Sequence, residues 1–388
     1  SQEYSFEETC LPVKLINGHI AFLLKHNVDY IFLPHLHTMK HAGSNVREDY
    51  ACVYMQTSPK IIDNVFDLKE RNVELICPTI SFNFGKEYMI KTLLSIGKQL
   101  GKNKIETTAA VMLGMKKFME YEKHLEKLGK EVLKDIDKDE KVFVILSRIY
   151  NVVDPVLNMG IENRLKELGY KVLYLSHLEA GEVRLKEEYQ NMYWPFGQHT
   201  LTGVEIIKNS ENLYPIYITN HGCGPDTILT HYFKKEIGDK PYLHIEVDEH
   251  SSKVGVITRV EAFVHSLDNH IEDKKQNIDS SKKQQSELKQ IEVTMDEEIA
   301  TDIDENKIII PSIYPYSNIV KAFLERQGKE VIVLDEVDED SIEFGKKFSM
   351  SKEYFSLIAV LGEVINYINK NNEKHTLFFP TNEGSETF

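Results

Sequence analysis

The chain has 388 residues, of which 41% are hydrophobic and 28% are charged, and its 46 basic against 61 acidic side chains leave a formal net charge of −15. At about 150 residues per domain, this length predicts two or three domains with ample core, and the composition excludes wholesale disorder. The negative charge argues against a nucleic-acid backbone or an anionic membrane surface as the main partner.

No apolar run approaches the roughly 18 residues that a membrane helix needs. The first residues, SQEYSFEETC, lack the basic and apolar regions of a signal peptide. Four cysteines are too few for a disulfide scaffold in a chain of this size. We therefore expect a cytoplasmic protein with reduced thiols.

Short β-branched and aromatic runs alternate with helical patterns along the chain. The expected strands cover residues 29–34, 73–80, 141–147, 171–176, 213–219, 241–247, 307–312, 330–336 and 375–381. Helices are expected at 11–26, 105–134 and 160–169, and the apolar stripe of the second is expected to lie in a core or to form a helix-packing face. Most strands are nearly continuous apolar runs, which is typical of parallel sheets covered on both faces. The sequence thus predicts an α/β fold.

Composition and the positions of the cysteines suggest four segments. The stretch after residue 265 is crowded with charged side chains and glutamine, which indicates a solvated connector or, alternatively, a partner-docking arm. The last segment resembles earlier helix–strand units but lacks cysteines. The expected segments are 1–138 with Cys10 and Cys52, 139–265 with Cys223, the connector 266–305, and the degenerate C-terminal α/β repeat 306–388.

Three cysteines stand where a predicted helix begins. Cys10 precedes L-P-V-K-L, Cys52 precedes V-Y-M-Q-T-S-P, and Cys223 lies in H-G-C-G-P-D after the strand at 213–219. A helix N-terminus favours thiolate over thiol, and the carboxyl end of a parallel strand is where α/β sheets place ligands. Thiolates on three loops suit an iron–sulfur cluster. The competing interpretation is that these thiols are small, buried hydrophobic side chains.

Longer motifs resemble one known family. E-E-T-C-L-P-V-K-L-I-N-G-H, M-Y-W-P-F-G-Q-H-T-L-T-G, N-H-G-C-G-P-D and P-Y-L-H-I-E-V-D-E-H occur in this order. They resemble the 2-hydroxyacyl-CoA dehydratase superfamily, most closely its activase-related and double-cubane-cluster branch. The resemblance covers residues 7–265 and continues more faintly through 307–388.

This resemblance implies stacked Rossmann-like domains with mainly parallel sheets and helices on both faces, in an oxygen-sensitive protein of anaerobic metabolism. It also implies a cysteine-bound [4Fe–4S] cluster, which a separate ATP-hydrolysing iron–sulfur activator supplies with electrons. Cys10, Cys52 and Cys223 stand at the family's ligand positions. A homodimer or heterodimer is expected.

The chain departs from the double-cubane branch in its second half. Where that branch carries further cysteines, this chain has Tyr354 and Glu386. A double cubane held by this chain alone is therefore not expected. One three-cysteine [4Fe–4S] site remains, with an open or non-cysteine fourth position at which iron binds a substrate oxygen as a Lewis acid.

The fourth cysteine and a histidine group suggest other possibilities. Cys77 lies in the apolar run E-L-I-C-P-T-I and is expected to be a core thiol. His35, His37 and His41 form H-x-H-x₃-H, which together with Cys52 makes a zinc-binding module a third hypothesis. Solvated or locally bonded histidines are the ordinary alternative.

Further polar residues gather near the third cysteine in the sequence. His199 and His221 are candidates for proton transfer. The carboxylates near the strand ends are expected to cap helices or form salt bridges, or else to line the cleft; they are Asp226, Glu246, Asp248 and Glu249.

Nucleotide-binding signatures are missing, so neither ATP nor NAD is expected on this chain. The leading hypothesis is an iron–sulfur reductase or dehydratase-type lyase. It would accept low-potential electrons from the activator and pass them to a small substrate, with acyl-CoA as one candidate. The alternative is a non-catalytic scaffold or partner-binding relative that has lost part or all of its cluster site.

Overall fold

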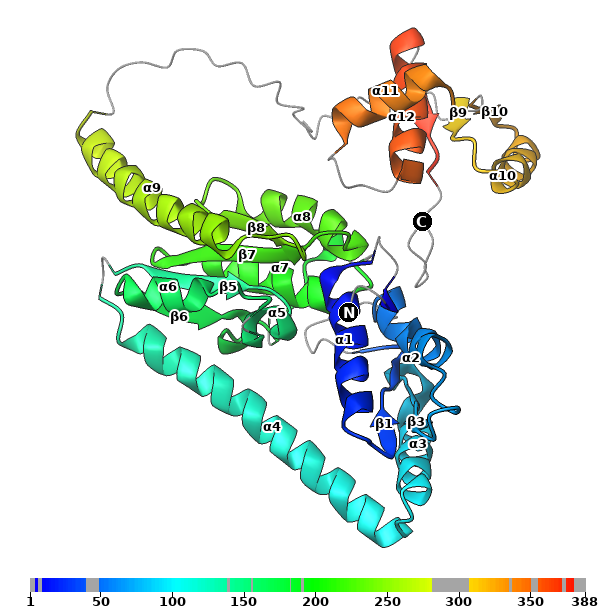
Figure 1. The fold of residues 1–388 in the computed structure, drawn as a ribbon. Coiled ribbons are helices and arrows are strands. Elements are labelled where there is room, and N and C mark those ends of the chain that lie inside the picture. The colour runs from blue at the N-terminus through cyan, green and yellow to red at the C-terminus, as the bar shows by residue number, and fades with distance from the viewer. Residues whose placement is uncertain are drawn as a thin grey trace. The chain divides into compact units, whose positions relative to one another are not determined.

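The computed structural model describes residues 4–5, 9–39, 49–137, 140–154, 156–181, 183–189, 192–280, 307–334, 337–349, 355–371 and 375–379. The chain divides into two compact units, Ser1–Ile271 and Glu272–Phe388 (Figure 1). All paired strands named below run parallel. The predicted α/β class with mainly parallel sheets is confirmed.

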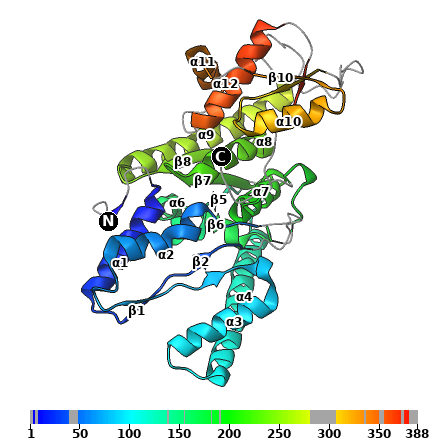
Figure 2. The same cartoon turned by 90° about the vertical axis from the view of Figure 1, so that its right-hand side faces the viewer.

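The N-terminal part of unit 1 contains two short strand pairs between helices. Its elements are α1 (Leu11–Lys25), β1 (Tyr30–Phe32), β2 (His35–Leu36), α2 (Val53–Phe66), β3 (Glu74–Ile76), β4 (Thr79–Ile80), η2 (Phe82–Phe84), α3 (Gly85–Gln99) and α4 (Lys104–Lys134). Strand β1 pairs with β3 and β2 with β4. The strand predicted at 73–80 is divided at Pro78 into β3 and β4, because proline has no N–H to donate to a ladder, and β2 begins after Pro34, beyond the strand predicted at 29–34. Figure 2 shows α1 and α2 side by side beside these strands.

A four-stranded sheet forms the centre of unit 1. Its elements are β5 (Val142–Leu146), α5 (Ile149–Val153), α6 (Ile161–Glu167), β6 (Lys171–Tyr174), η3 (Leu175–His177), η4 (Glu187–Tyr189), α7 (Pro195–Lys208), β7 (Leu213–Asn220), α8 (Gly224–Ile237), β8 (Leu243–Val247) and α9 (Lys253–Ser280). Every residue of β5 and β7 is buried. Helices α6 and α9 pack on one face of the sheet, and α7 and α8 pack on the other. The two covered faces explain the unbroken apolar runs of these strands.

The order of the sheet is β6-β5-β7-β8. The chain passes from β5 outward to β6 and then returns to add β7 on the opposite side of β5. The direction of winding therefore reverses between β5 and β7. In open α/β sheets, ligands bind outside the carboxyl ends of the strands at this reversal. The residues that follow β5 and β7 are thus the ones that the topology places at a binding position.

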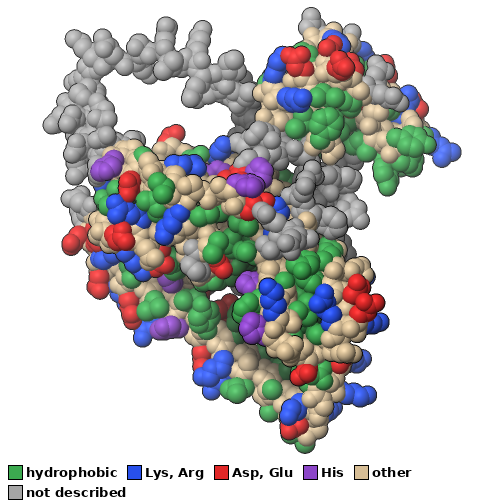
Figure 3. All heavy atoms as spheres, in the orientation of Figure 1, with side chains coloured by type: hydrophobic (Ala, Val, Ile, Leu, Met, Phe, Trp, Pro, Cys, Tyr) green, Lys and Arg blue, Asp and Glu red, His purple; other side chains and the backbone are tan. Residues whose placement is uncertain are grey.

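Helix α4 differs from its prediction. Of its expected core stripe, Met115 and Phe118 are 62% and 61% exposed and Leu128 is 38% exposed, whereas Val111, Leu125 and Val132 are half-buried. The expectation of a core stripe is wrong for the exposed three. The helix contacts α3 and η3, near its two ends, so its middle turns have no apolar surface to cover them among the described residues. On the face drawn in Figure 3, described acidic and basic side chains are interspersed.

Unit 2 is a smaller layer structure of the same kind. Its elements are β9 (Lys307–Ile310), α10 (Tyr316–Glu325), β10 (Glu330–Val333), α11 (Glu339–Phe348), α12 (Phe355–Lys370) and β11 (Thr376–Leu377). The strand order is β10-β9-β11. Helix α10 packs on one face and α12 on the other. Tyr354 and Glu386, where the resemblance led us to expect cysteines, lie outside the described residues.

The charged connector predicted at 266–305 is described only in its first part. Helix α9 continues to Ser280, and residues 281–306 lie outside the described part of the chain. No described helix combines the length and hydropathy needed to cross a membrane.

Candidate functional site

Each of the three predicted ligand cysteines is the N-cap of a helix. Cys10 caps α1, Cys52 caps α2 and Cys223 caps α8, and the backbone of each is extended. Proline in the first turn helps α1 and α8 to begin there. The prediction that the three cysteines stand at helix starts is confirmed, and the helix after Cys52 is longer than expected, with 14 residues.

The fold brings these thiols toward one another from distant parts of the sequence. Cys10 is close enough to Cys52 and to Cys223 for their charges to interact. Cys10 and Cys223 are buried and Cys52 is half-buried. Across the described residues, however, no group of three or more His, Cys, Asp or Glu side chains is close enough to hold a metal ion. The donor set is chemically suited to a metal, but it does not form a closed coordination sphere.

Burial governs the protonation of two of these thiols. It raises the pKa of Cys10, although the Val13 backbone N–H lowers it. Burial also raises the pKa of Cys223 well above its ordinary value, and the Asp226 carboxylate adds to the effect. The expectation that helix N-termini favour thiolate is therefore overridden here by desolvation, because a buried charged sulfur loses its hydration.

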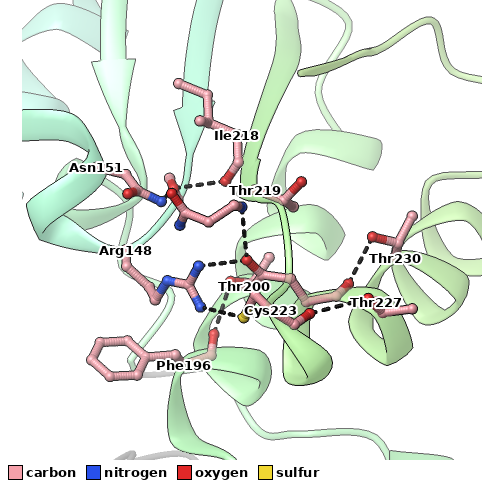
Figure 4. Close-up of polar contacts among 12 residues, drawn as sticks. Arg148, Asn151, Phe196, Thr200, Ile218, Thr219, Cys223, Thr227 and Thr230 are labelled. Carbon is pink, nitrogen blue, oxygen red and sulfur yellow. Dashed lines mark hydrogen bonds and ion pairs between the residues drawn. The ribbon is translucent and has the colours of Figure 1, made fainter. Parts of the chain in front are cut away.

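Arg148 is the group that contacts the third cysteine directly (Figure 4). It follows β5, so it lies at the reversal of winding opposite the loop after β7. Its Nη1 donates to the Cys223 Sγ at 3.3 Å and its Nη2 donates to Asp226 Oδ2 at 2.5 Å. The guanidinium carbon lies 5.3 Å from the ring centre of Tyr150 and 5.4 Å from that of Trp194. Although burial works against the charged form, Asp226 and the other neighbours hold the pKa of Arg148 well above its usual value.

Two buried polar groups beside this network lack partners. In the described part of the chain, neither Trp194 Nε1 nor the side-chain amide atoms of Asn220 form a hydrogen bond. Trp194 and Asn220 are each 3% exposed. The backbone oxygen of Asn220 accepts from the Cys223 N–H at 3.2 Å. Such orphaned groups are rare in folded proteins, and their place beside Arg148 and Cys223 is consistent with a site built for a further polar group.

Cys77 is exposed, so the prediction of a core thiol is wrong. Strand β3 ends at the buried Ile76, and alternation along an extended chain turns the next side chain to the opposite face. Cys77 also follows the last paired residue of β3, in the short connection through Pro78 to β4.

The histidines do not form the zinc site of the third hypothesis within the described residues. The Nδ1 atom of His35 lies 2.6 Å from the backbone oxygen of Gln56, and that of His37 lies 3.1 Å from Ser81 Oγ. His41 lies outside the described residues. These contacts fit the ordinary alternative of locally bonded histidines.

The proton-transfer candidates differ in their surroundings. His199 is half-buried in α7. The side chain of His221 is 60% exposed, and its Nδ1 lies 2.6 Å from Glu246 Oε1. Glu246 extends from β8, beside the end of β7. The exposed histidine is thus held by a carboxylate of the neighbouring strand and is open to exchange protons with water.

The remaining strand-end carboxylates have structural partners, as one interpretation expected. Asp226 pairs with Arg148, and Asp248 accepts from the Ser251 hydroxyl at 2.7 Å. Glu249 pairs with Lys14 of α1, and Lys14 is 5% exposed. This last pair ties the helix that begins after Cys10 to the loop after β8.

The Lys14–Glu249 pair is expected to make stability depend on acid pH. The hydrogen bond from Lys14 lowers the pKa of Glu249 below 4.5. A carboxyl whose pKa is lowered by folding stabilises the fold above its unfolded pKa, and that contribution disappears as the pH falls through the folded pKa. Glu249→Gln should therefore lower the free energy of unfolding by about 1–2 kcal/mol at neutral pH.

Urea denaturation of both proteins from neutral pH downward measures this difference, which should shrink in acid. The exposed Glu187 provides the control, because Glu187→Gln should have little effect at any pH. An equal difference between wild type and Glu249→Gln at all pH values would contradict the assignment.

Comparison with known proteins gives a family match for one part of the chain. Residues 1–178 match a family described as CoA enzyme activase uncharacterised domain. No curated protein and no solved structure gives a significant match. The matched residues contain α1 and α2 with Cys10 and Cys52, and also β5 and Arg148. At this coarse level, the first 178 residues are similar to that activase-related domain, which fits the broader part of the sequence resemblance.

Proposed function

We propose that this protein binds an iron–sulfur cluster, accepts low-potential electrons from an ATP-dependent activator and passes them to a small substrate, with an acyl-CoA thioester as the first candidate. The observation that carries the proposal is the common placement of Cys10, Cys52 and Cys223. Each caps a helix, and Cys10 lies near enough to both of the others for charge on one sulfur to affect the pKa of another. The match of residues 1–178 to a CoA enzyme activase domain supports the same class of function.

These three cysteines would hold the cluster, and the cluster would supply single-electron transfer and a Lewis-acidic iron. The chain's own contribution is the environment. Burial of Cys10 and Cys223 excludes water, and the N–H groups at the start of the three helices would compensate negative charge that a bound cluster brings to the sulfurs. Because burial favours the neutral thiols, loading would release protons.

His221 is the described residue that we assign to proton supply. It stands two positions before Cys223, and Glu246 holds its Nδ1. Its side chain is exposed to solvent, whereas the groups around Arg148 are buried. This division suits a site that must keep its redox chemistry dry and still deliver protons to a substrate.

Metal analysis after anaerobic purification tests the proposal. We expect about four iron and four acid-labile sulfide per chain. Cys10→Ser, Cys52→Ser and Cys223→Ser should each lose most of the iron. Cys77→Ser is the matched control and should keep it, because Cys77 is exposed and lies outside the three helix caps. A colourless wild type without iron, even after reconstitution, would contradict the proposal.

One observation favours the alternative of a non-catalytic scaffold. The described residues contain no ready group of metal ligands. A scaffold would remain folded and colourless, and its three cysteine variants would behave like Cys77→Ser.

A further inference from the structure

The buried side chain of Arg148 has further contacts besides its ion pair with Asp226. Both Arg148 and Asp226 are almost completely buried, at 8% and 5% exposed. Burying a guanidinium is costly unless its charge and its N–H groups are satisfied. Asp226 supplies the counter-charge, and the rings of Tyr150 and Trp194 lie within cation–π distance of the guanidinium carbon.

The two arms of the guanidinium are used differently. An arginine that serves only a carboxylate commonly donates both arms to it. Here Nη2 donates to Asp226 and Nη1 donates to the sulfur of Cys223 at 3.3 Å. Asp226 is three residues after Cys223, in the first turn of α8, so the carboxylate sets the distance between the arginine and the sulfur.

The sulfur is also held from its own backbone. The Cys223 N–H donates to the oxygen of Asn220, and the Cys223 carbonyl accepts from the N–H and the hydroxyl of Thr227. Both partners of the N–H···S contact therefore stand on fixed backbone at the reversal of the sheet. The third predicted cysteine alone has a buried cation in hydrogen-bond contact among the described residues.

We propose that Arg148 is a positioning residue that fixes the sulfur of Cys223 and keeps a positive charge against it. The functional consequence rests on the proposed cluster. An N–H···S hydrogen bond from a cation stabilises added negative charge on the sulfur, so it raises the reduction potential of a cluster held there. The contact itself exists without a cluster, and it can be tested without one.

The first test uses a full-length chain in which Cys10, Cys52 and Cys77 are serine, so that Cys223 is the only thiol. Its rate of alkylation is measured with anionic iodoacetate and with neutral iodoacetamide at one pH. Ionisation of the thiol changes both alkylation rates by the same factor. The ratio of the two rates therefore reports the electrostatic potential at the Cys223 sulfur. We expect Arg148→Met to lower the iodoacetate-to-iodoacetamide ratio by about threefold, from the loss of one nearby charge.

Arg164→Met is the matched control, because Arg164 pairs with Glu167 and Glu261 on the surface of α6. It should leave the ratio unchanged. If Arg148→Met does not fold, Arg148→Gln takes its place, since the amide keeps a hydrogen bond to Asp226 without the charge. An unchanged ratio in a folded Arg148 variant would overturn the proposal.

The second test measures the reduction potential of the cluster in the chain with all its cysteines. Arg148→Gln should retain iron and lower the potential, whereas Arg164→Met should change neither. Retained iron with an unchanged potential would overturn the tuning role. If the wild type holds no iron, the proposed function fails, and the alkylation ratio still decides whether Arg148 acts on Cys223.

Discussion

Asp226→Asn is expected to lower the free energy of unfolding of unit 1 by about 3–5 kcal/mol. The substitution keeps the shape of the side chain but removes the counter-charge of Arg148, which is 8% exposed and lies 2.5 Å from Asp226. Cys223 cannot replace that charge, because burial raises the pKa of its thiol and keeps it neutral. The buried guanidinium would be left uncompensated.

Tryptophan fluorescence during urea denaturation measures this effect. Trp194 is the chain's single tryptophan and is buried in unit 1 beside Arg148, so it reports this unit alone. Asp239→Asn is the control at an exposed aspartate after the same helix. A loss below about 1 kcal/mol, the size of an exposed ion pair, would show that water reaches the guanidinium. The double change Arg148→Met with Asp226→Leu should recover part of the loss, since it removes both charges.

Gly362→Ala is expected to disrupt the packing of α11 against α12 in unit 2. A Cβ at Gly362 would lie 1.7 Å from the backbone oxygen of Ser341 and 2.7 Å from the N of Gly345. Backbone atoms on a facing helix cannot rotate away as a side chain can. The two helices must therefore separate, at a cost of about 1–3 kcal/mol or more.

Hydrogen exchange on the intact chain separates this effect from a general loss of stability. The amides of α12 should lose protection, while those of β7 and the fluorescence transition of Trp194 should not change. Gly114→Ala is the matched control, because a Cβ at this position in α4 meets nothing within 4 Å. It should stabilise α4 by about 0.5–1 kcal/mol through the ordinary helix preference of alanine. Unchanged protection of α12 in Gly362→Ala would mean that the close approach of the two helices is wrong.

Features that depend on neighbours along the chain could be predicted from the sequence. The apolar runs of β5 and β7, and the proline that follows Cys10 and Cys223, are local signals of buried strands and helix starts. They place the three cysteines at helix N-termini without knowledge of the tertiary structure. The motifs around Cys10 and Cys52 also indicated a resemblance of the activase-related kind, and residues 1–178 match a CoA enzyme activase uncharacterised domain.

Whether a side chain is buried was harder to predict from the sequence. Burial depends on which other elements cover the face of the helix or strand on which that side chain lies. Phe118 has the spacing of a core residue but stands on a stretch of α4 that no described element covers. Cys77 lies in an apolar run but follows the end of β3, where its side chain is exposed. In both cases periodicity identifies a shared face, and only packing decides whether that face is buried.

The contact between Arg148 and Cys223 belongs to the tertiary structure alone, since 75 residues separate them. Arg148 could have been singled out as a charged residue directly after an apolar strand, but its partner follows from the order β6-β5-β7-β8, which brings the ends of β5 and β7 together. The sequence by itself determined the α/β class, the strands and the helix starts that carry the cysteines, because these depend on short-range backbone chemistry. The tertiary structure decided that the thiols converge, that two of them are buried and neutral, and that a buried arginine touches one of them, because desolvation and long-range contacts exist only once the layers have packed.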